Sequence, residues 1–125
     1  MKLLIKGAEA ALPTGSGSAS NFDNATVSII SVGHNLTSDV IKKPIAMGAD
    51  EIITCDEEKV KNIDVNATAL IISKLIEKTG PYDVIFSGRH ASDFDMATVP
   101  FALSEILSIP IVNIVRNINI CFILN

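Results

Sequence analysis

The sequence contains no tryptophan, one tyrosine and five phenylalanines, so aromatic residues make up only 5% of its 125 residues. Charged residues are also scarce, at 19%, whereas hydrophobic residues reach 48% and the mean hydropathy is +0.41. This apolar content excludes intrinsic disorder as a description of the whole chain. The length is typical of one small domain, and we expect residues 1–125 to form a single domain.

Cysteine and histidine are rare as well. Cys55 and Cys121 are the two cysteines, and His34 and His90 are the two histidines. None of the four has a partner at the spacing of zinc ligands, so we expect no metal site. Two distant cysteines favour a reduced, cytoplasmic setting over a disulfide framework.

Basic clusters and membrane segments are missing too. The net charge is −4, and Lys42–Lys43 is the only basic pair, which argues against a nucleic-acid partner. The apolar stretch before Gly7 is too short for a signal peptide. The longer stretch over residues 106–124 contains Pro110 and Arg116, which a membrane helix does not readily carry. We therefore expect no membrane span.

Isoleucine is abundant instead, with nineteen copies, and such β-branched residues favour strands buried on both faces of a sheet. Apolar runs predict strands over residues 1–6, 25–32, 51–54, 82–86 and 109–115. Helical spacing and end signals predict helices over residues 35–47, 64–79 and 98–107. Alternation of strands and helices with short connections is typical of a doubly wound, mostly parallel α/β sheet covered by helices on both faces.

Several local signals refine this pattern. Pro44 lies inside the first predicted helix and should shorten or kink it, whereas Pro100 is tolerated in the first turn of the last helix. Asp64 can cap the second helix at its amino end, and Gly80 can end it. The composition of residues 7–24 predicts a flexible loop.

Ligands of such sheets bind at the carboxyl ends of strands, so we expect a site in the loops after Val32, Thr54 and Phe86. The loop from Ser87 to Thr98 is the most informative, because it runs into a helix whose free amides and dipole favour an anion. Four of its residues suit an anionic ligand through close backbone approach, charge-assisted hydrogen bonds or a hydroxyl: Gly88, Arg89, His90 and Thr98.

Asp93 and Asp95 in the same loop would repel a phosphate, so we assign them to capping the helix or holding the loop. An ordinary polar surface loop is the alternative interpretation.

Catalysis is poorly supported by the sequence. His90 lies too close in sequence to Ser92 and Asp93 for a triad, and the two aspartates lack a cleft for acid–base work. Cys55 is followed by three acidic residues, which make it a poor candidate for a nucleophile.

Several segments resemble one family. Ala46–Glu51, which reads Ala-Met-Gly-Ala-Asp-Glu, resembles a signature of the electron transfer flavoprotein β subunit. Tyr82–His90 is similar to the strand that leads into Gly-Arg-Gln in that family, and Asp93-x-Asp95 stands where the family has Asp-Gly-Asp. Leu107–Pro110 matches the Leu-Gly-Leu-Pro before the next strand. The resemblance covers about residues 25–116.

This resemblance implies an adenine nucleotide alpha hydrolase-like, Rossmann-like fold of three layers, with the family core at residues 25–116 and an apolar tail at 117–125. It implies a β-type subunit that binds AMP, or FAD in an electron-bifurcating complex. The subunit would pair with an α-type flavoprotein subunit to carry electrons from acyl-CoA-type or other dehydrogenases, and would not be an enzyme by itself. The implied nucleotide contacts are Val32, Gly88, Arg89, His90, Asp93, Asp95, Met96, Ala97, Thr98 and Val99.

Within this set, the backbone amides of residues 97–99 would hold the phosphate. The chain departs from the family pattern at His90 and Thr98, where glutamine is usual, and at Phe94, Ala97 and Pro100, which stand near family glycines. It is also shorter than family members. Two alternatives stay open: a stand-alone nucleotide-binding module like the universal stress proteins, able to form a homodimer, and a degenerate scaffold without activity.

Overall fold

The computed structural model describes residues 2–6, 26–88 and 98–115. The strands are β1 (Lys2–Lys6), β2 (Thr26–Gly33), β3 (Glu51–Asp56) and β4 (Val84–Ser87). The helices are α2 (Ser38–Ala46), α3 (Val65–Thr79) and α4 (Thr98–Leu107), with a single 3₁₀ turn, η1, at Glu58–Val60.

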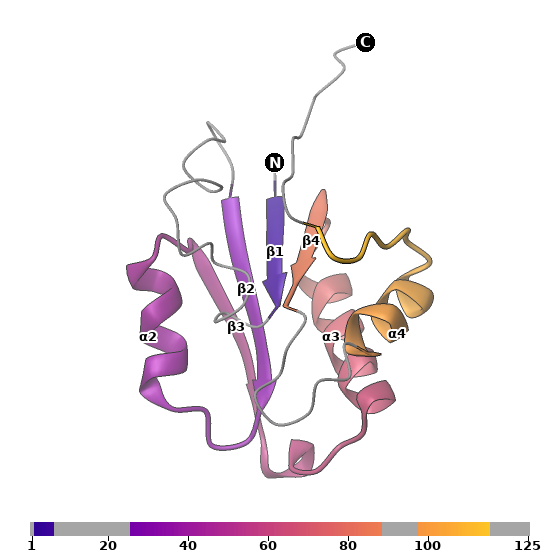
Figure 1. The fold of residues 1–125 in the computed structure, drawn as a ribbon. Coiled ribbons are helices and arrows are strands. Elements are labelled where there is room, and N and C mark those ends of the chain that lie inside the picture. The colour runs from indigo at the N-terminus through magenta and orange to yellow at the C-terminus, as the bar shows by residue number, and fades with distance from the viewer. Residues whose placement is uncertain (1, 7–25, 89–97, 116–125) are drawn as a thin grey trace.

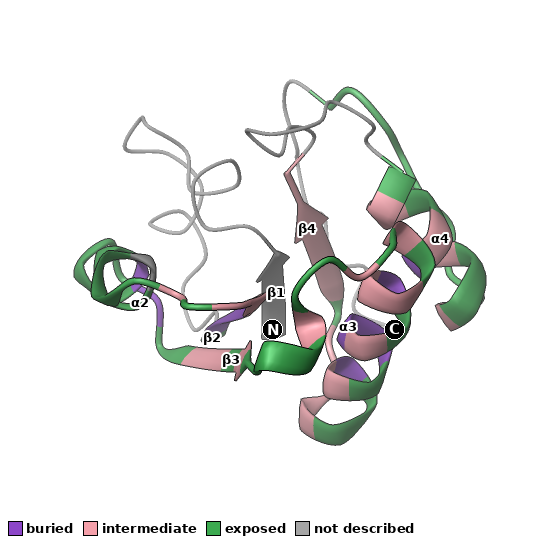
Figure 2. Cartoon of the chain, turned by 90° about the horizontal axis from the view of Figure 1, so that it is seen from below, coloured by how far each residue is buried: buried purple, intermediate pink, exposed green. Residues whose placement is uncertain are grey.

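The four strands form one sheet in the order β3-β2-β1-β4, and every described pairing is parallel (Figure 1). β1 lies inside the sheet, where Leu3 is in register with Val27 of β2 and Val84 of β4. Seen along the strands, α2 covers one face of the sheet, and α3 and α4 cover the other (Figure 2). The fold is therefore the doubly wound α/β fold in three layers that the sequence predicts.

Strand β2 explains why the chain needs so many β-branched residues. Val27, Ser28, Ile29 and Ile30 are all buried, although neighbours on a strand point to opposite faces. Ile30 faces α3, so Ile29 points toward the α2 layer. A strand that is covered on both faces has no solvent side and reads as a continuous apolar run.

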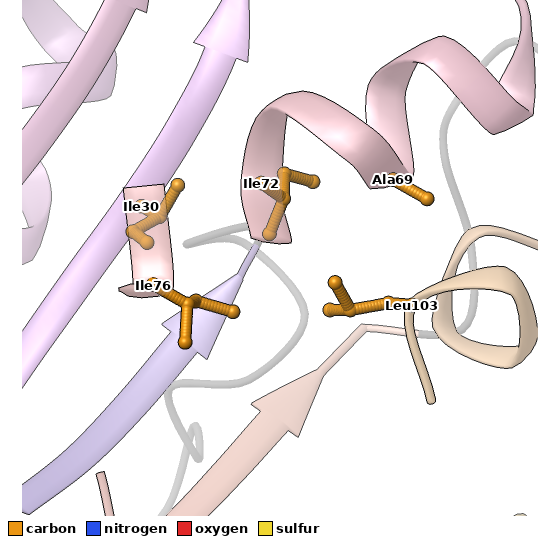
Figure 3. Packing of buried hydrophobic residues seen from close by; sticks show 5 residues of the cluster. All are labelled: Ile30, Ala69, Ile72, Ile76 and Leu103. Atoms are coloured by element: carbon orange, nitrogen blue, oxygen red, sulfur yellow. The ribbon is translucent and has the colours of Figure 1, made fainter. Parts of the chain in front are cut away.

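The main core lies between the sheet and the α3–α4 layer. It is formed by Ile30, Ala69, Ile72, Ile76 and Leu103, of which Ile30, Ala69 and Ile72 have no exposed surface (Figure 3). The three α3 residues of this cluster recur at a helical spacing, so one face of α3 meets β2. Leu103 ties α4 to the same cluster, which fixes the position of α4.

Both end signals of α3 are confirmed. The Oδ1 atom of Asp64 accepts a hydrogen bond of 2.7 Å from the amide of Ala67, which is the geometry of an N-cap. The helix ends at Gly80, where a Cβ atom would lie 2.8 Å from the carbonyl oxygen of Ile76. Glycine is thus required at this end of the helix by a close backbone approach.

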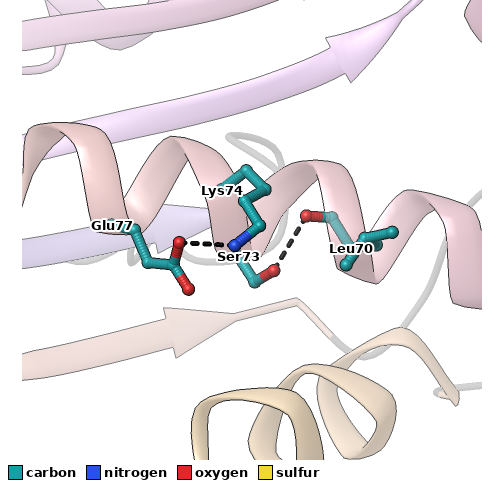
Figure 4. Close-up of polar contacts among 4 residues, drawn as sticks. All are labelled: Leu70, Ser73, Lys74 and Glu77. Atoms are coloured by element: carbon teal, nitrogen blue, oxygen red, sulfur yellow. Dashed lines mark hydrogen bonds and ion pairs between the residues drawn. The ribbon is translucent and has the colours of Figure 1, made fainter.

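Polar groups on α3 are paired locally (Figure 4). Ser73 is buried, and its hydroxyl donates to the carbonyl of Leu70 at 2.8 Å, so the core holds no unpaired hydroxyl there. Lys74 and Glu77 form an ion pair of 2.7 Å on the solvent side. Such an exposed pair adds less than about 1 kcal/mol, so the apolar face, and not the ion pair, holds α3 in place.

The Ala46–Glu51 motif forms the turn between α2 and β3, at the amino edge of the sheet. Gly48 has a φ of 100°, and Ala49 is buried. Asp50 exchanges two hydrogen bonds with Val27: its amide donates to the carbonyl at 2.9 Å, and its Oδ2 accepts from the amide at 2.8 Å. The motif therefore sets the register between β2 and β3, on the side of the sheet opposite the strand carboxyl ends.

Replacing Gly48 by alanine is expected to lower the free energy of unfolding by about 1 kcal/mol. A Cβ atom at Gly48 would meet nothing within 4 Å, so the loss comes from the positive φ alone. Urea unfolding of Gly48→Ala measures it. Gly48→Asn is the matched control and should lose less, because asparagine tolerates the left-handed region. An asparagine variant less stable than the alanine variant would contradict this account.

The first helix is shorter than expected. It begins at Ser38 and not at residue 35, because Asn35 has a φ of 55°, which no right-handed helix contains. It continues through Pro44 and ends at Ala46, one residue before the predicted end. β3 extends to Asp56, two residues beyond the predicted end at Thr54. The last helix has the predicted bounds.

The predicted strand over residues 109–115 is wrong: this segment is neither strand nor buried. Ser108 and Ile114 have φ angles of 54° and 55°, which interrupt an extended run. Val112 and Ile114 are 80% and 71% exposed. The segment is apolar, as the prediction requires, but an apolar pattern alone does not supply a neighbouring strand to pair with.

The predicted loop at 7–24 and the predicted tail at 117–125 lie outside the described residues. Within the described part of the chain, no helix is long and apolar enough to span a membrane.

Candidate functional site

The strand order places a switch point between β1 and β4. From β1 the chain moves to β2 and then to β3 on one side, whereas β4 lies on the other side of β1. Ligands of open parallel sheets bind in the crevice at such a point, beyond the strand carboxyl ends. Lys6 and Ser87, which end β1 and β4, are in register there.

The three loops expected to form the site lie at different distances from this switch point. Of these, the one after β4 lies at the switch point, and the one after Val32 lies one strand away. The loop after Thr54 lies two strands away, since β3 is the outer strand of the described sheet. The segment after β1, which the search omitted, begins at the switch point, but residues 7–25 lie outside the described part of the chain.

The carboxyl edge of the sheet is uneven. β1 ends at Lys6, which is in register with Ile30, whereas β2 and β3 continue for three more pairs. The middle pair joins Val32 to Cys55. Val32 therefore lies beyond the end of β1 and borders the space above the switch point from the β2 side.

Four of the ten predicted contacts lie in the described residues, and all four are at this edge. Val32 belongs to the last part of β2, Gly88 directly follows β4, and Thr98 and Val99 begin α4. Figure 1 shows α4 beginning on the side where the strands end. The other six lie outside the described residues: Arg89, His90, Asp93, Asp95, Met96 and Ala97.

The side chains of Val32 and Val99 both pack against the main core cluster. Both side chains are apolar and half-buried, so the polar groups that these residues can offer a ligand are their backbone atoms. At Val99 this leaves an amide in the first turn of α4, where helix amides have no partner within the helix. Pro100 supplies no amide, so the donors of this turn are confined to residues that precede it.

The three helices differ in the charge at their amino ends. At α3 the carboxylate of Asp64 occupies the cap, and at α2 the carboxylate of Asp56 accepts hydrogen bonds from the amides of Asn35 and Leu36, just before the helix. Both ends already hold a negative charge, which repels an anion. The first turn of α4 contains no acidic residue. At α4, therefore, no acid of the described first turn opposes an anion.

Other chemistry finds little support in the described residues. Cys55 is half-buried on β3, and no group of three His, Cys, Asp or Glu side chains within the described ranges is placed to hold a metal ion. The hypothetical triad of Ser92, His90 and Asp93 lies outside those ranges.

Asp56 is the residue that the sequence analysis missed. It was considered only as one of the acids after Cys55, yet its carboxylate joins the end of β3 to the loop after β2. The sequence contains a signal for this contact: Asp56 is an acidic residue at the end of a strand, and in a parallel sheet such a residue can reach the loop that follows the neighbouring strand.

The parallel strands, the helices on both faces and the switch point define a Rossmann-like α/β protein. The sequence matches the family described as "Electron transfer flavoprotein domain" over residues 6–121. This chain belongs to the electron transfer flavoprotein family.

Individual relatives agree with this assignment. The chain is 39% identical over 94 residues to the electron transfer flavoprotein subunit beta of Thermoanaerobacterium thermosaccharolyticum, which covers 75% of this chain and 36% of the relative. It is 34% identical over 96 residues to the subunit beta of Clostridium acetobutylicum, covering 77% and 37%. It is 38% identical over 86 residues to the acryloyl-CoA reductase electron transfer subunit gamma of Anaerotignum propionicum, covering 67% and 32%. The chain thus spans about a third of the length of these relatives.

Proposed function

We propose that this chain is a β-type subunit of an electron transfer flavoprotein and that it binds an adenine nucleotide at the carboxyl edge of its sheet. The observation that carries the proposal is the switch point between β1 and β4 in a chain that belongs to this family. Helix α4, which follows β4, has no acid in its first turn. AMP is the simplest candidate ligand, and FAD is the alternative.

The geometry supports a definite orientation for the nucleotide. Its phosphate would lie at the amino end of α4, where the amides of Thr98 and Val99 belong to the first turn. Gly88, next to β4, would allow close approach of the ligand to the backbone. The nucleoside would extend toward Val32 on β2. We retain Arg89, His90, Asp93, Asp95, Met96 and Ala97 as proposed contacts from the family resemblance.

The electron carrier in this proposal is the flavin of a partner subunit, and the β-type chain supplies a nucleotide site and a binding surface. It would pair with an α-type flavoprotein subunit and, through the complex, accept electrons from acyl-CoA-type or other dehydrogenases. We assign no catalytic residue to this chain. Exposed apolar side chains support assembly with another polypeptide, and they include Ile106, Ile109, Ile111, Val112, Ile114 and Val115.

The nucleotide proposal is tested with Thr98→Glu. A carboxylate at the first position of α4 would repel a phosphate, so the Kd for AMP, measured by calorimetry, should rise at least about tenfold. The same carboxylate suits the helix dipole, so the variant should unfold at a denaturant concentration no lower than the unaltered chain. Loss of binding without loss of stability separates ligand repulsion from misfolding.

Ser38→Glu is the matched control, because Ser38 occupies the first position of α2 and is exposed like Thr98. Its affinity for AMP should equal that of the unaltered chain. Equal losses in both variants would contradict a phosphate site at α4. Absence of AMP and FAD binding in the unaltered chain would remove the nucleotide proposal.

Assembly is tested separately by co-expression with an α-type flavoprotein subunit. Copurification of the two chains with bound flavin is the expected result. A chain that stays monomeric beside the α-type subunit would contradict the proposed pairing, and a homodimer would favour the stand-alone module instead.

A further inference from the structure

Asp56 makes a bidentate contact at the carboxyl edge of the sheet. It is the last residue of β3, in register with Gly33, the last residue of β2. Its Oδ1 accepts from the amide of Asn35 at 2.8 Å, and its Oδ2 accepts from the amide of Leu36 at 3.0 Å. One carboxylate thus fixes two consecutive amides of the loop between β2 and α2.

The same loop is also held from its other side. A Cβ atom on Gly33 would lie 2.8 Å from the Cδ2 atom of Leu36, so the Leu36 side chain lies directly against the end of β2. Asn35, between them, takes a positive φ of 55° that its short polar side chain tolerates. The loop after Val32 therefore has a defined conformation without any ligand.

This loop borders the proposed site. Val32 directly precedes it and lies beyond the end of β1. β2 and β4 are separated by β1, hence by two interstrand spacings, or about 10 Å. A ligand whose phosphate lies at α4, beside β4, would therefore place its nucleoside end near the loop that Asp56 holds.

The charge of Asp56 adds a second effect. Two described helices follow a strand that is adjacent to β1: α4 follows β4, and α2 follows β2. The carboxylate of Asp56 lies against the amides just before α2. A phosphate at α2 would meet this negative charge. This charge would favour a nucleotide with its phosphate toward α4 and its uncharged nucleoside toward β2.

We infer that Asp56 is a positioning residue for the nucleotide: by fixing the amides of Asn35 and Leu36, it pre-orders the loop that receives the nucleoside end of the ligand. The inference rests on the proposed nucleotide binding. A loop that is already ordered loses little conformational freedom when the ligand binds, which raises affinity. This gain in affinity comes from the contacts with the nucleoside and not from the contacts with the phosphate at α4.

The test compares AMP with ribose 5-phosphate, which shares the phosphate but lacks the base. Both are titrated by NMR into the unaltered chain, Asp56→Ala, Asp56→Asn and the control Glu57→Gln. We expect Asp56→Ala to raise the Kd for AMP about tenfold and to leave the Kd for ribose 5-phosphate unchanged. Asp56→Asn keeps one acceptor oxygen and should show a smaller rise, and the exposed Glu57→Gln none.

The ratio of the two affinities distinguishes positioning from a structural role. General destabilisation weakens both ligands together, whereas positioning changes only AMP. If Asp56→Ala does not fold, the smaller change in Asp56→Asn carries the comparison. Unchanged AMP affinity in both variants, or equal losses for both ligands, overturns the inference while the proposed function stands. An unaltered chain that binds neither ligand overturns the proposed function, and the inference with it.

Discussion

Ile72→Ala should lower the free energy of unfolding by about 3 kcal/mol. Ile72 has no exposed surface and lies at the centre of the cluster that joins β2, α3 and α4 (Figure 3). Truncation removes three buried carbon atoms and leaves a cavity between helix and sheet that neighbouring side chains cannot fill. Domains of this size are stable by roughly 5–15 kcal/mol, so the loss is a large share of the total. Urea unfolding measures it as a shift of the midpoint at constant slope.

Leu70→Ala is the matched control on the same helix. The Leu70 side chain is 51% exposed, so its truncation should change stability by less than about 1 kcal/mol. The comparison isolates the buried face of α3 from its helical propensity. Losses of the same size for Leu70 and Ile72 would mean that α3 does not pack on the sheet through the face described above.

Asp50→Ala should lower the free energy of unfolding by about 2 kcal/mol, the second largest effect. The Oδ2 atom of Asp50 is the acceptor for the amide of Val27, which is buried at the start of β2. Alanine leaves that amide without its charged partner in a place where water has little access. The loss therefore includes the desolvation of an unpaired donor as well as the hydrogen bond itself.

Two further variants test the cause of this loss. Asp50→Asn keeps an amide oxygen that can accept from Val27 and should retain about half of the stability that alanine loses. Asp39→Ala removes an exposed acid from the first turn of α2, where only the helix dipole is affected, and should cost less than about 1 kcal/mol. An Asp50 variant that behaves like the Asp39 variant would contradict a structural role for the signature motif.

The parts of the fold that depend on neighbouring residues were predictable from the sequence. Helix α3 is the clearest case, because Asp64, Gly80 and the spacing of its isoleucines each act within a few positions. The segment at 109–115 failed for the opposite reason. Its composition suits a buried strand, but burial requires an adjacent strand, and composition does not supply that partner.

The candidate site divides in the same way. The position of Thr98 and Val99 at a helix start follows from local signals, and so does the glycine after β4. The role of Asp56 does not, because it depends on the register of β2 against β3, which places Gly33 beside a residue 23 positions away. The Ala-Met-Gly-Ala-Asp motif carries the family resemblance. Its positive φ at Gly48 and its hydrogen bond from Val27 to Asp50 show that the motif forms a structural turn at the amino edge of the sheet.

The position of β1 inside the sheet determines the order in which this chain can fold. Leu3 pairs with Val84, which lies 81 positions further along the chain. During synthesis, β1 and β2 are complete before β4 exists, so one edge of β1 stays unpaired until β4 has been made. Closing so long a loop is entropically unfavourable and slow. The switch point between β1 and β4 is therefore the last part of the described sheet to form, and the candidate site exists only in chains that have completed this step.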